Sequence, residues 1–177
     1  MKKFCFDNKE FYLDNGRLFD DSFIEVPKVT SNSILQYYFG QIDYHSYGED
    51  ELLNFIKELK SAEFFNPCLN VIFYGLTKFS ASHYYKKTVL PIITSCYRLI
   101  GTPQKAINFW LEKKDIFQDC VSAPLLTSLA AAYCDIGKYD FAKKYADRAY
   151  ALQGGSQEYE TELSIVYRRI KKESSTS

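Results

Sequence analysis

Few residues in this chain have side chains that could carry out acid–base, nucleophilic or metal chemistry. The sequence contains two histidines, His45 and His83, so a histidine-rich metal site is excluded by number. Either histidine could still activate a cysteine as a nucleophile, because the two partners need only be close in space. His45 lies among tyrosines at an expected helix end, and His83 directly precedes Tyr84 and Tyr85. We therefore expect both histidines to be surface or capping residues.

The cysteines and the acidic clusters also favour structural roles. The cysteines show no C-x-x-C pair and no regular short spacing, which indicates buried, reduced thiols in a cytoplasmic protein. They are Cys5, Cys68, Cys96, Cys120 and Cys134. The run Glu49-Asp50-Glu51 suits the positive end of a helix better than a metal site. Without a glycine-rich phosphate loop or a G-x-S-x-G nucleophile elbow, we expect no catalytic, cofactor-binding or metal-binding residues.

The composition is typical of a folded helical protein that does not bind nucleic acid. The chain is 46% hydrophobic and 17% aromatic, and its 8 glycines and 5 prolines favour helices over a turn-rich β fold. The net charge is zero, divided as −4 over residues 1–82 and +4 over residues 83–177. Affinity for nucleic acid depends largely on neutralising phosphates, so no nucleic-acid partner is expected. No apolar run approaches the roughly 18 residues of a membrane span, so we also expect no membrane association.

Four regions are expected along the chain. Residues 1–30 predict a small β-hairpin or three-stranded meander with a linker over 23–30, because Asn15-Gly16 is typical of a two-residue hairpin turn. Residues 31–82 predict a divergent helical hairpin region, with the first helix over 33–44. Residues 83–173 predict two related helical units and a polar capping helix, and residues 174–177 a disordered tail.

The two helical units repeat one pattern at a spacing of 36 residues. Leu90, Ile93, Tyr97, Gly101, Ala106 and Trp110 align with Leu126, Leu129, Tyr133, Gly137, Ala142 and Ala146. Each glycine is expected to end a first helix, and the small residue after it lets the second helix approach closely. Pro91 and Pro124 each fall near the start of a first helix, where proline is tolerated. The last helix continues the pattern with Leu163 and Tyr167, each 34 residues after its counterpart.

The second unit, residues 122–155, resembles a tetratricopeptide repeat (TPR), and the resemblance extends over about residues 87–172. Tyr133, Ala142 and Ala149 match the family pattern, while a leucine replaces its tryptophan. The resemblance implies a solenoid of stacked helical hairpins that holds a peptide or a protein surface in a concave, helix-lined groove.

Alignment to the family places six first-helix residues on that groove, and these are candidate partner-binding residues. They are Ser95, Arg98, Thr127, Ala131, Cys134 and Asp135. Some members of the family clamp the carboxylate tails of heat-shock chaperones with lysine and asparagine on this face. Thr127 and Ala131 occupy the positions needed for that clamp, so chaperone-tail binding is disfavoured.

The sequence thus predicts a mainly α protein, a TPR-like solenoid with a small N-terminal β element, that works as a protein–protein interaction module. An adaptor, a chaperone or an inhibitor of the immunity type would fit. The expected partner is another protein or peptide, and a homodimer is a further candidate. Because tyrosine is enriched at interfaces, Tyr84 and Tyr85 join the candidate partner-binding residues. The alternatives are an enzyme with its site in the N-terminal half and, less favoured, an RNA-binding helical-repeat protein.

Overall fold

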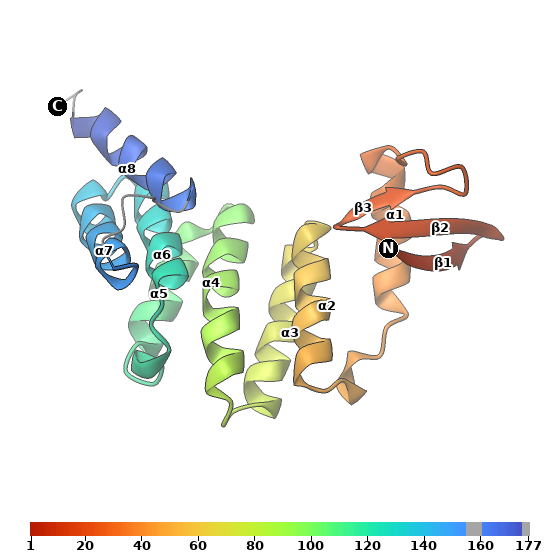
Figure 1. The fold of residues 1–177 in the computed structure, drawn as a ribbon, viewed down its shortest axis with the longest axis horizontal. Coiled ribbons are helices and arrows are strands. Elements are labelled where there is room, and N and C mark those ends of the chain that lie inside the picture. Colours follow the sequence, from red (N-terminus) through yellow and green to blue (C-terminus); the bar gives the residue numbers. More distant parts are fainter. Residues whose placement is uncertain (155–160, 175–177) are drawn as a thin grey trace. The chain divides into compact units, whose positions relative to one another are not determined.

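The computed structural model of the chain describes residues 1–154 and 161–174. Within these ranges a three-stranded antiparallel sheet is followed by eight α-helices, which confirms a mainly helical fold with a small N-terminal β element (Figure 1). The chain divides into two compact units, residues 1–75 and 76–177, and each is described by itself.

The N-terminal sheet is a meander with two tight turns. Its strands, in spatial order, are β1 (Lys2–Phe6), β2 (Lys9–Asp14) and β3 (Arg17–Phe19). Asn15 and Gly16 turn between β2 and β3 with φ angles of 47° and 81°, as their sequence predicted. Asp7 and Asn8 make the other turn with φ angles of 50° and 60°. Asn and Asp tolerate this left-handed conformation, so the first turn forms without a glycine.

Three helices follow the sheet, and the first begins earlier than predicted. They are α1 (Lys28–Gly40), α2 (Glu49–Ser61) and α3 (Phe65–Lys78), with the 3₁₀ helix η1 (Tyr44–Ser46) before α2. Residues 28–30 were predicted to be linker but belong to α1. Pro27 starts this helix, because its carbonyl accepts hydrogen bonds from the N–H groups of Thr30 and Ser31. Pro27 itself has an extended backbone, with φ −53° and ψ 141°, as is usual for the residue that precedes a helix.

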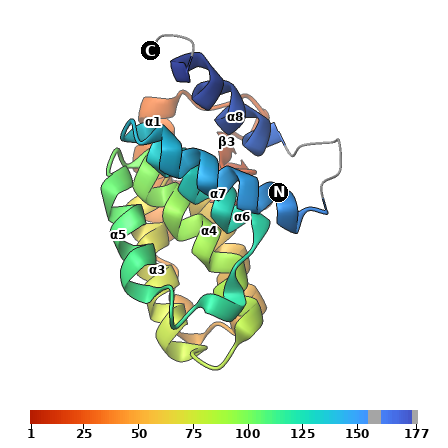
Figure 2. The same cartoon turned by 90° about the vertical axis from the view of Figure 1, so that its left-hand side faces the viewer.

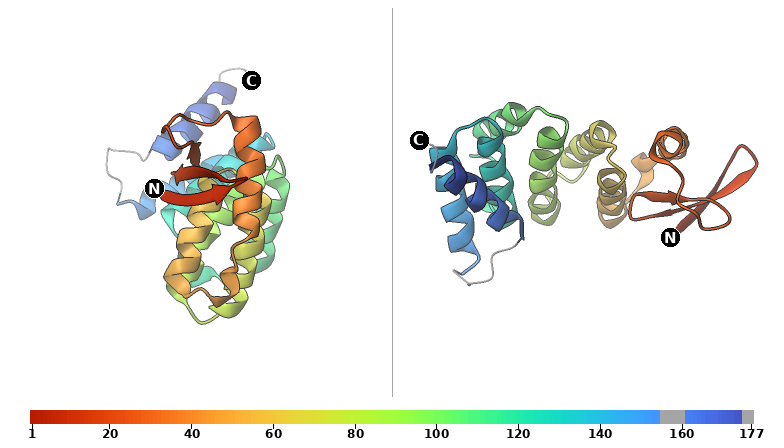
Figure 3. Two further views of the ribbon diagram at one scale, coloured as in Figure 1. Left: turned by 90° about the vertical axis from the view of Figure 1, so that its right-hand side faces the viewer. Right: turned by 90° about the horizontal axis from the view of Figure 1, so that it is seen from above.

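The sheet packs on the helices of its own unit (Figure 3). Its buried apolar residues are Phe11, Leu13 and Leu18. The ring of Phe4 stacks on Tyr38 of α1 with their centroids 4.2 Å apart. A Cβ atom at Gly16 would lie 2.1 Å from the carbonyl oxygen of Ser61, so only glycine allows this turn to touch the end of α2.

The second unit is built from helices joined by short connections. They are α4 (His83–Leu99), α5 (Pro103–Lys113), α6 (Ala123–Asp135), α7 (Tyr139–Leu152) and α8 (Thr161–Ser174), with the 3₁₀ helix η2 (Gln118–Cys120) before α6. Gly101 and Gly137 connect α4 to α5 and α6 to α7 with φ angles of 83° and 71°. Ser174, predicted to begin a disordered tail, is the last residue of α8, and residues 175–177 lie outside the described part.

The two prolines expected near helix starts differ in position. Pro124 lies in the first turn of α6, whereas Pro91 lies inside α4. Helix α4 already begins at His83, because the hydroxyl of Ser82 accepts a hydrogen bond of 3.0 Å from the N–H of Tyr85 and caps the helix. Pro91 therefore removes one backbone hydrogen bond from the interior of α4.

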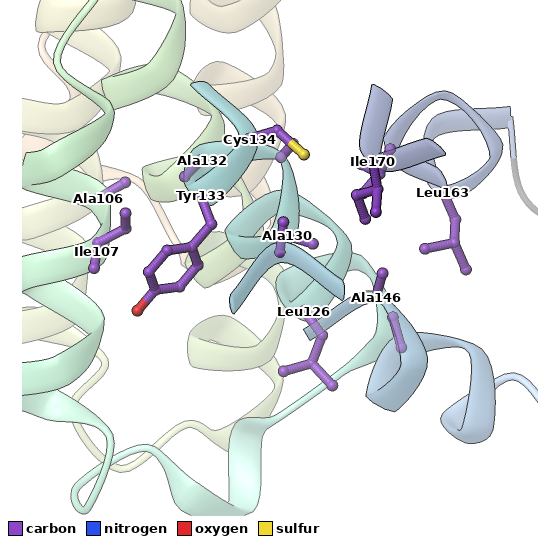
Figure 4. Packing of buried hydrophobic residues seen from close by; sticks show 14 residues of the cluster. Ala106, Ile107, Leu126, Ala130, Ala132, Tyr133, Cys134, Ala146, Leu163 and Ile170 are labelled. Carbon is purple, nitrogen blue, oxygen red and sulfur yellow. The ribbon is translucent and has the colours of Figure 1, made fainter. Parts of the chain in front are cut away.

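A core of small and aliphatic residues holds α5 to α8 together. Ala106, Ala142 and Ala146 are all 0% exposed, so the small residues of the repeated pattern do face neighbouring helices. Leu163 and Ile170 of α8 point into the same core (Figure 4). Burying one such aliphatic side chain contributes about 1.5–3 kcal/mol, so α8 is held in place mainly by this apolar face.

Candidate protein-binding surface

Both histidines form exposed hydrogen bonds near helix ends. One carboxylate oxygen of Asp43 accepts a hydrogen bond of 3.1 Å from the backbone N–H of His45, and the Nδ1 atom of the same histidine lies 2.9 Å from it. These two hydrogen bonds, the backbone one first, lower the pKa of the Asp43 carboxyl. The two side chains are 63% and 77% exposed, so the pair faces solvent rather than a cavity. The Nε2 atom of His83 lies 2.7 Å from the carbonyl oxygen of Asp119.

Four of the five cysteines are buried, and Cys5 is exposed. Burial raises the pKa of the Cys120 and Cys134 thiols, which keeps both in the unreactive protonated form. In the part of the chain that the structure describes, no three His, Cys, Asp or Glu side chains form a group that could hold a metal ion.

The candidate partner-binding residues of α6 are largely covered. Thr127, Ala131 and Cys134 are 1%, 6% and 3% exposed. Residues of α8 lie beside Thr127 and Ala131, and Figure 2 shows this helix next to the α6–α7 pair. Ser95 and Arg98 of α4 are half-buried and keep accessible surface. A partner could therefore contact α4 directly but could reach α6 only beside α8.

The two tyrosines at the start of α4 have different surroundings. Tyr84 is 59% exposed, whereas Tyr85 is 0% exposed and packs its ring against Phe79 at a centroid distance of 5.4 Å. Only Tyr84 of the two is accessible to a partner.

One carboxylate connects three helices of the second unit. Asp135 at the end of α6 accepts a hydrogen bond of 2.6 Å from the Nε atom of Arg98 on α4. Its other oxygen lies 2.8 Å from the Nη2 atom of Arg169 on α8. Two guanidinium groups share this one carboxylate, so the cluster carries excess positive charge. The sequence singled out Arg98 and Asp135 for this face but missed Arg169.

The same three helices enclose a small hollow of about 150 Å³. We call it the α4–α6–α8 hollow, and its walls include Arg98, Thr127, Ala131, Ile165 and Arg169. The Oγ1 atom of Thr127 is buried and has no hydrogen-bond partner among the described residues. Ile165 stands at the rim and is 44% exposed. The walls also include Glu162, so the hollow combines an apolar edge and two guanidinium groups with the carboxylates of Asp135 and Glu162.

The α8 side of this hollow was missed, although the repeat spacing contained a signal for it. The same 34-residue offset that relates the last helix to α6 pairs Ile165 with Ala131 and Arg169 with Asp135. Treating the last helix only as a polar cap concealed these two positions.

Comparison with protein-family models, curated proteins and solved structures gives no match for this chain. Each helix in the described residues is too short or too polar to cross a bilayer.

Proposed function

We propose that the chain is a protein–protein interaction module of the TPR-like type, and that it binds a protein or peptide through the α4–α6–α8 hollow. The single observation that carries this proposal is the hollow itself, which residues of α4, α6 and α8 line together and at whose rim the apolar side chain of Ile165 is 44% exposed.

The chemistry of the rim suggests what kind of segment would bind. Ile165 offers an apolar contact, and Arg98 and Arg169, with the carboxylates of Asp135 and Glu162 beside them, offer hydrogen-bond donors and acceptors. A volume of about 150 Å³ fits one side chain or a chain terminus rather than a cofactor, for which cavities of about 300–1,000 Å³ are usual. A peptide with an apolar side chain next to polar groups therefore fits best.

The helical frame supports the same proposal. The residues of the hollow lie on three helices: the buried core around Ala142 and Leu163 joins α6 to α8, and Tyr97 of α4 packs against the same core. Contact residues on rigid elements lose little conformational freedom when a partner binds, which favours affinity. The repeated Gly and Ala positions and the resemblance to TPR proteins support this proposal, because stacked helical repeats commonly hold other proteins.

Affinity purification with matched variants tests the proposal. The tagged full-length chain is purified from the cells that produce it, and co-purifying proteins are quantified by mass spectrometry. Ile165→Glu places a charge at the rim of the hollow and should remove the specific partner. Arg168→Glu places the same side chain on an exposed position of the same helix, outside the hollow, and should leave the partner bound.

Circular dichroism must first show that both variants keep the wild-type helix content. Recovery of no protein partner with the folded wild-type chain would contradict the proposal. Equal retention of the partner by both variants would contradict its assignment to the hollow.

A further inference from the structure

A second and larger hollow lies elsewhere in the same unit and is lined by other residues. Its volume is about 480 Å³, and it is bordered by α5 and α7 with α6 between them. Trp110 of α5 and Tyr133 of α6 belong to its inner wall, since each is only 5% exposed. Leu111 and Phe141 stand at the rim, 46% and 53% exposed. Large apolar side chains are therefore accessible here around an aromatic interior.

The aromatic side chains of this hollow are held by stacking. Tyr133 stacks on Phe141 and on Tyr145 with centroid distances of 5.4 Å and 5.2 Å. Burial, followed by the neighbouring Tyr145, raises the pKa of Tyr133 to about 12. The stacked rings give the wall a fixed shape on which a ligand can pack.

A smaller cavity of about 340 Å³ continues this hollow along α7. Val121 and Arg148 line both cavities, and the smaller one extends to Leu152, which is 57% exposed. We call the joined cavities the α5–α7 cleft. From Phe141 to Leu152 the cleft follows α7 for about 17 Å, at the helical rise of about 1.5 Å per residue. That length fits three turns of a helix and is too long for a single side chain.

The charges along the α5–α7 cleft are mostly positive. Lys114, Lys144 and Arg148 line it, against one carboxylate, that of Asp115. None of the three cations forms an ion pair with another described residue, although Arg148 lies over the ring of Tyr145 at 5.9 Å. Their charge is thus available to a partner, and it excludes a basic one.

We propose that the α5–α7 cleft is a second docking site, and that it binds an acidic amphipathic segment of a partner protein. The apolar side chains of the segment would pack against Trp110, Phe141 and Leu152. Its carboxylates would face Lys114, Lys144 and Arg148. An amphipathic helix laid into a groove recognises its partner in this way, through apolar anchors three or four residues apart. This site shares α6 with the α4–α6–α8 hollow but uses other residues of it, and it does not depend on the function proposed for that hollow.

Trp110 gives a direct readout, because it is the only tryptophan in the chain and lies inside the cleft. A random library of peptides about 14 residues long is selected on the immobilised full-length chain. Each selected peptide is then titrated into the free chain while tryptophan emission is followed; the peptides carry no tryptophan of their own. Peptides that change the emission should be acidic, with apolar residues at helical spacing. Replacing their acidic residues by lysine should weaken binding at least about tenfold.

Two adjacent lysines of α7 provide matched variants. Lys144 lines the cleft, whereas Lys143 is exposed outside it and lies 3.1 Å from Asp147. Lys144→Glu should weaken the binding of the acidic peptides at least about fivefold, because a charge acts most strongly on groups in direct contact. Lys143→Glu should weaken their binding by less than about twofold.

Three results would overturn the proposal. The first is that no selected peptide changes the emission of Trp110. The second is that the peptides that do so are neutral or basic. The third is that Lys143→Glu and Lys144→Glu weaken the binding of these peptides equally, because the peptides would then not contact the chain in the cleft.

Discussion

The buried hydroxyl of Thr127 can be removed with almost no change in side-chain shape. Thr127→Val replaces the hydroxyl by a methyl group, and both residues are β-branched, so the helix is little affected. The Oγ1 atom of Thr127 has no hydrogen-bond partner among the described residues and is shielded from solvent. Its burial is therefore a cost without a compensating bond. We expect Thr127→Val to raise the free energy of unfolding by about 1–2 kcal/mol.

Thr94 provides the matched control for this substitution. It is also 1% exposed, on α4, but its hydroxyl donates a hydrogen bond of 3.1 Å to the carbonyl oxygen of Leu90. Thr94→Val removes a bond that is made and should lower the free energy of unfolding by about 0.5–1.5 kcal/mol. A difference of about 2 kcal/mol between the two variants corresponds to roughly 4–8 °C in Tm for a chain of this size.

Urea unfolding followed by far-UV circular dichroism measures both variants against the wild type. We expect opposite signs, with Thr127→Val more stable and Thr94→Val less stable than the wild type. A loss of stability in Thr127→Val would refute this prediction, because the hydroxyl would then have a hydrogen-bond partner in solution.

Three further predictions test the frame of the second unit. Ala142→Leu should lower the free energy of unfolding by about 1–3 kcal/mol, because Ala142 is 0% exposed and a larger side chain would overpack the core. The control Ala151→Leu lies on the exposed side of α7 and should change the free energy of unfolding by less than about 0.5 kcal/mol. Equal effects in urea unfolding would contradict close packing at Ala142. Gly137→Ala should lower Tm, because the φ of 71° at this position strains a residue with a side chain by about 1 kcal/mol. Gly40→Ala in α1 is the control and should raise Tm slightly, because a Cβ atom there meets no neighbour within 4 Å. Shifts of Tm in the same direction for both variants would contradict the turn geometry. The pKa of Tyr133 is about 12 in the folded chain and 10 in the unfolded chain. Between these two pH values the unfolded chain loses the proton first, so the free energy of unfolding should fall as pH rises from 10 to about 12. Tyr133→Phe should remove this part of the fall, and an unchanged pH profile of the unfolding midpoint would contradict the raised pKa.

The features that could be predicted from the sequence depend on local requirements. Asn15-Gly16 predicted a turn because both residues tolerate positive φ, and they adopt it. Gly101 and Gly137 likewise end helices with positive φ at the predicted spacing. Ala142 had to be small for two helices to approach, and it is fully buried. Each of these conclusions needs only backbone conformation and side-chain size.

The missed features depend on which residues meet in space. Ser82 caps α4 ahead of Pro91, so the helix begins well before the proline that was expected near its start. The covering of Thr127 depends on where α8 packs, which the sequence of α6 does not contain. Lys114 and Lys144 lie on different helices, and only the packing of α5 and α7 around α6 brings both to one cleft.

Photo-cross-linking inside the producing cells tests most directly whether the face of α4 that carries Ser95 and Arg98 binds a protein. A photoreactive amino acid replaces Ser95, the half-buried residue of α4 on the predicted partner-binding face, and Lys105, an exposed residue of α5 outside both proposed sites, in turn. We expect a discrete heavier protein adduct from position 95 and none of that size from position 105. The absence of any protein adduct from position 95 in the folded chain, or the same adducts from both positions, would contradict the proposed binding.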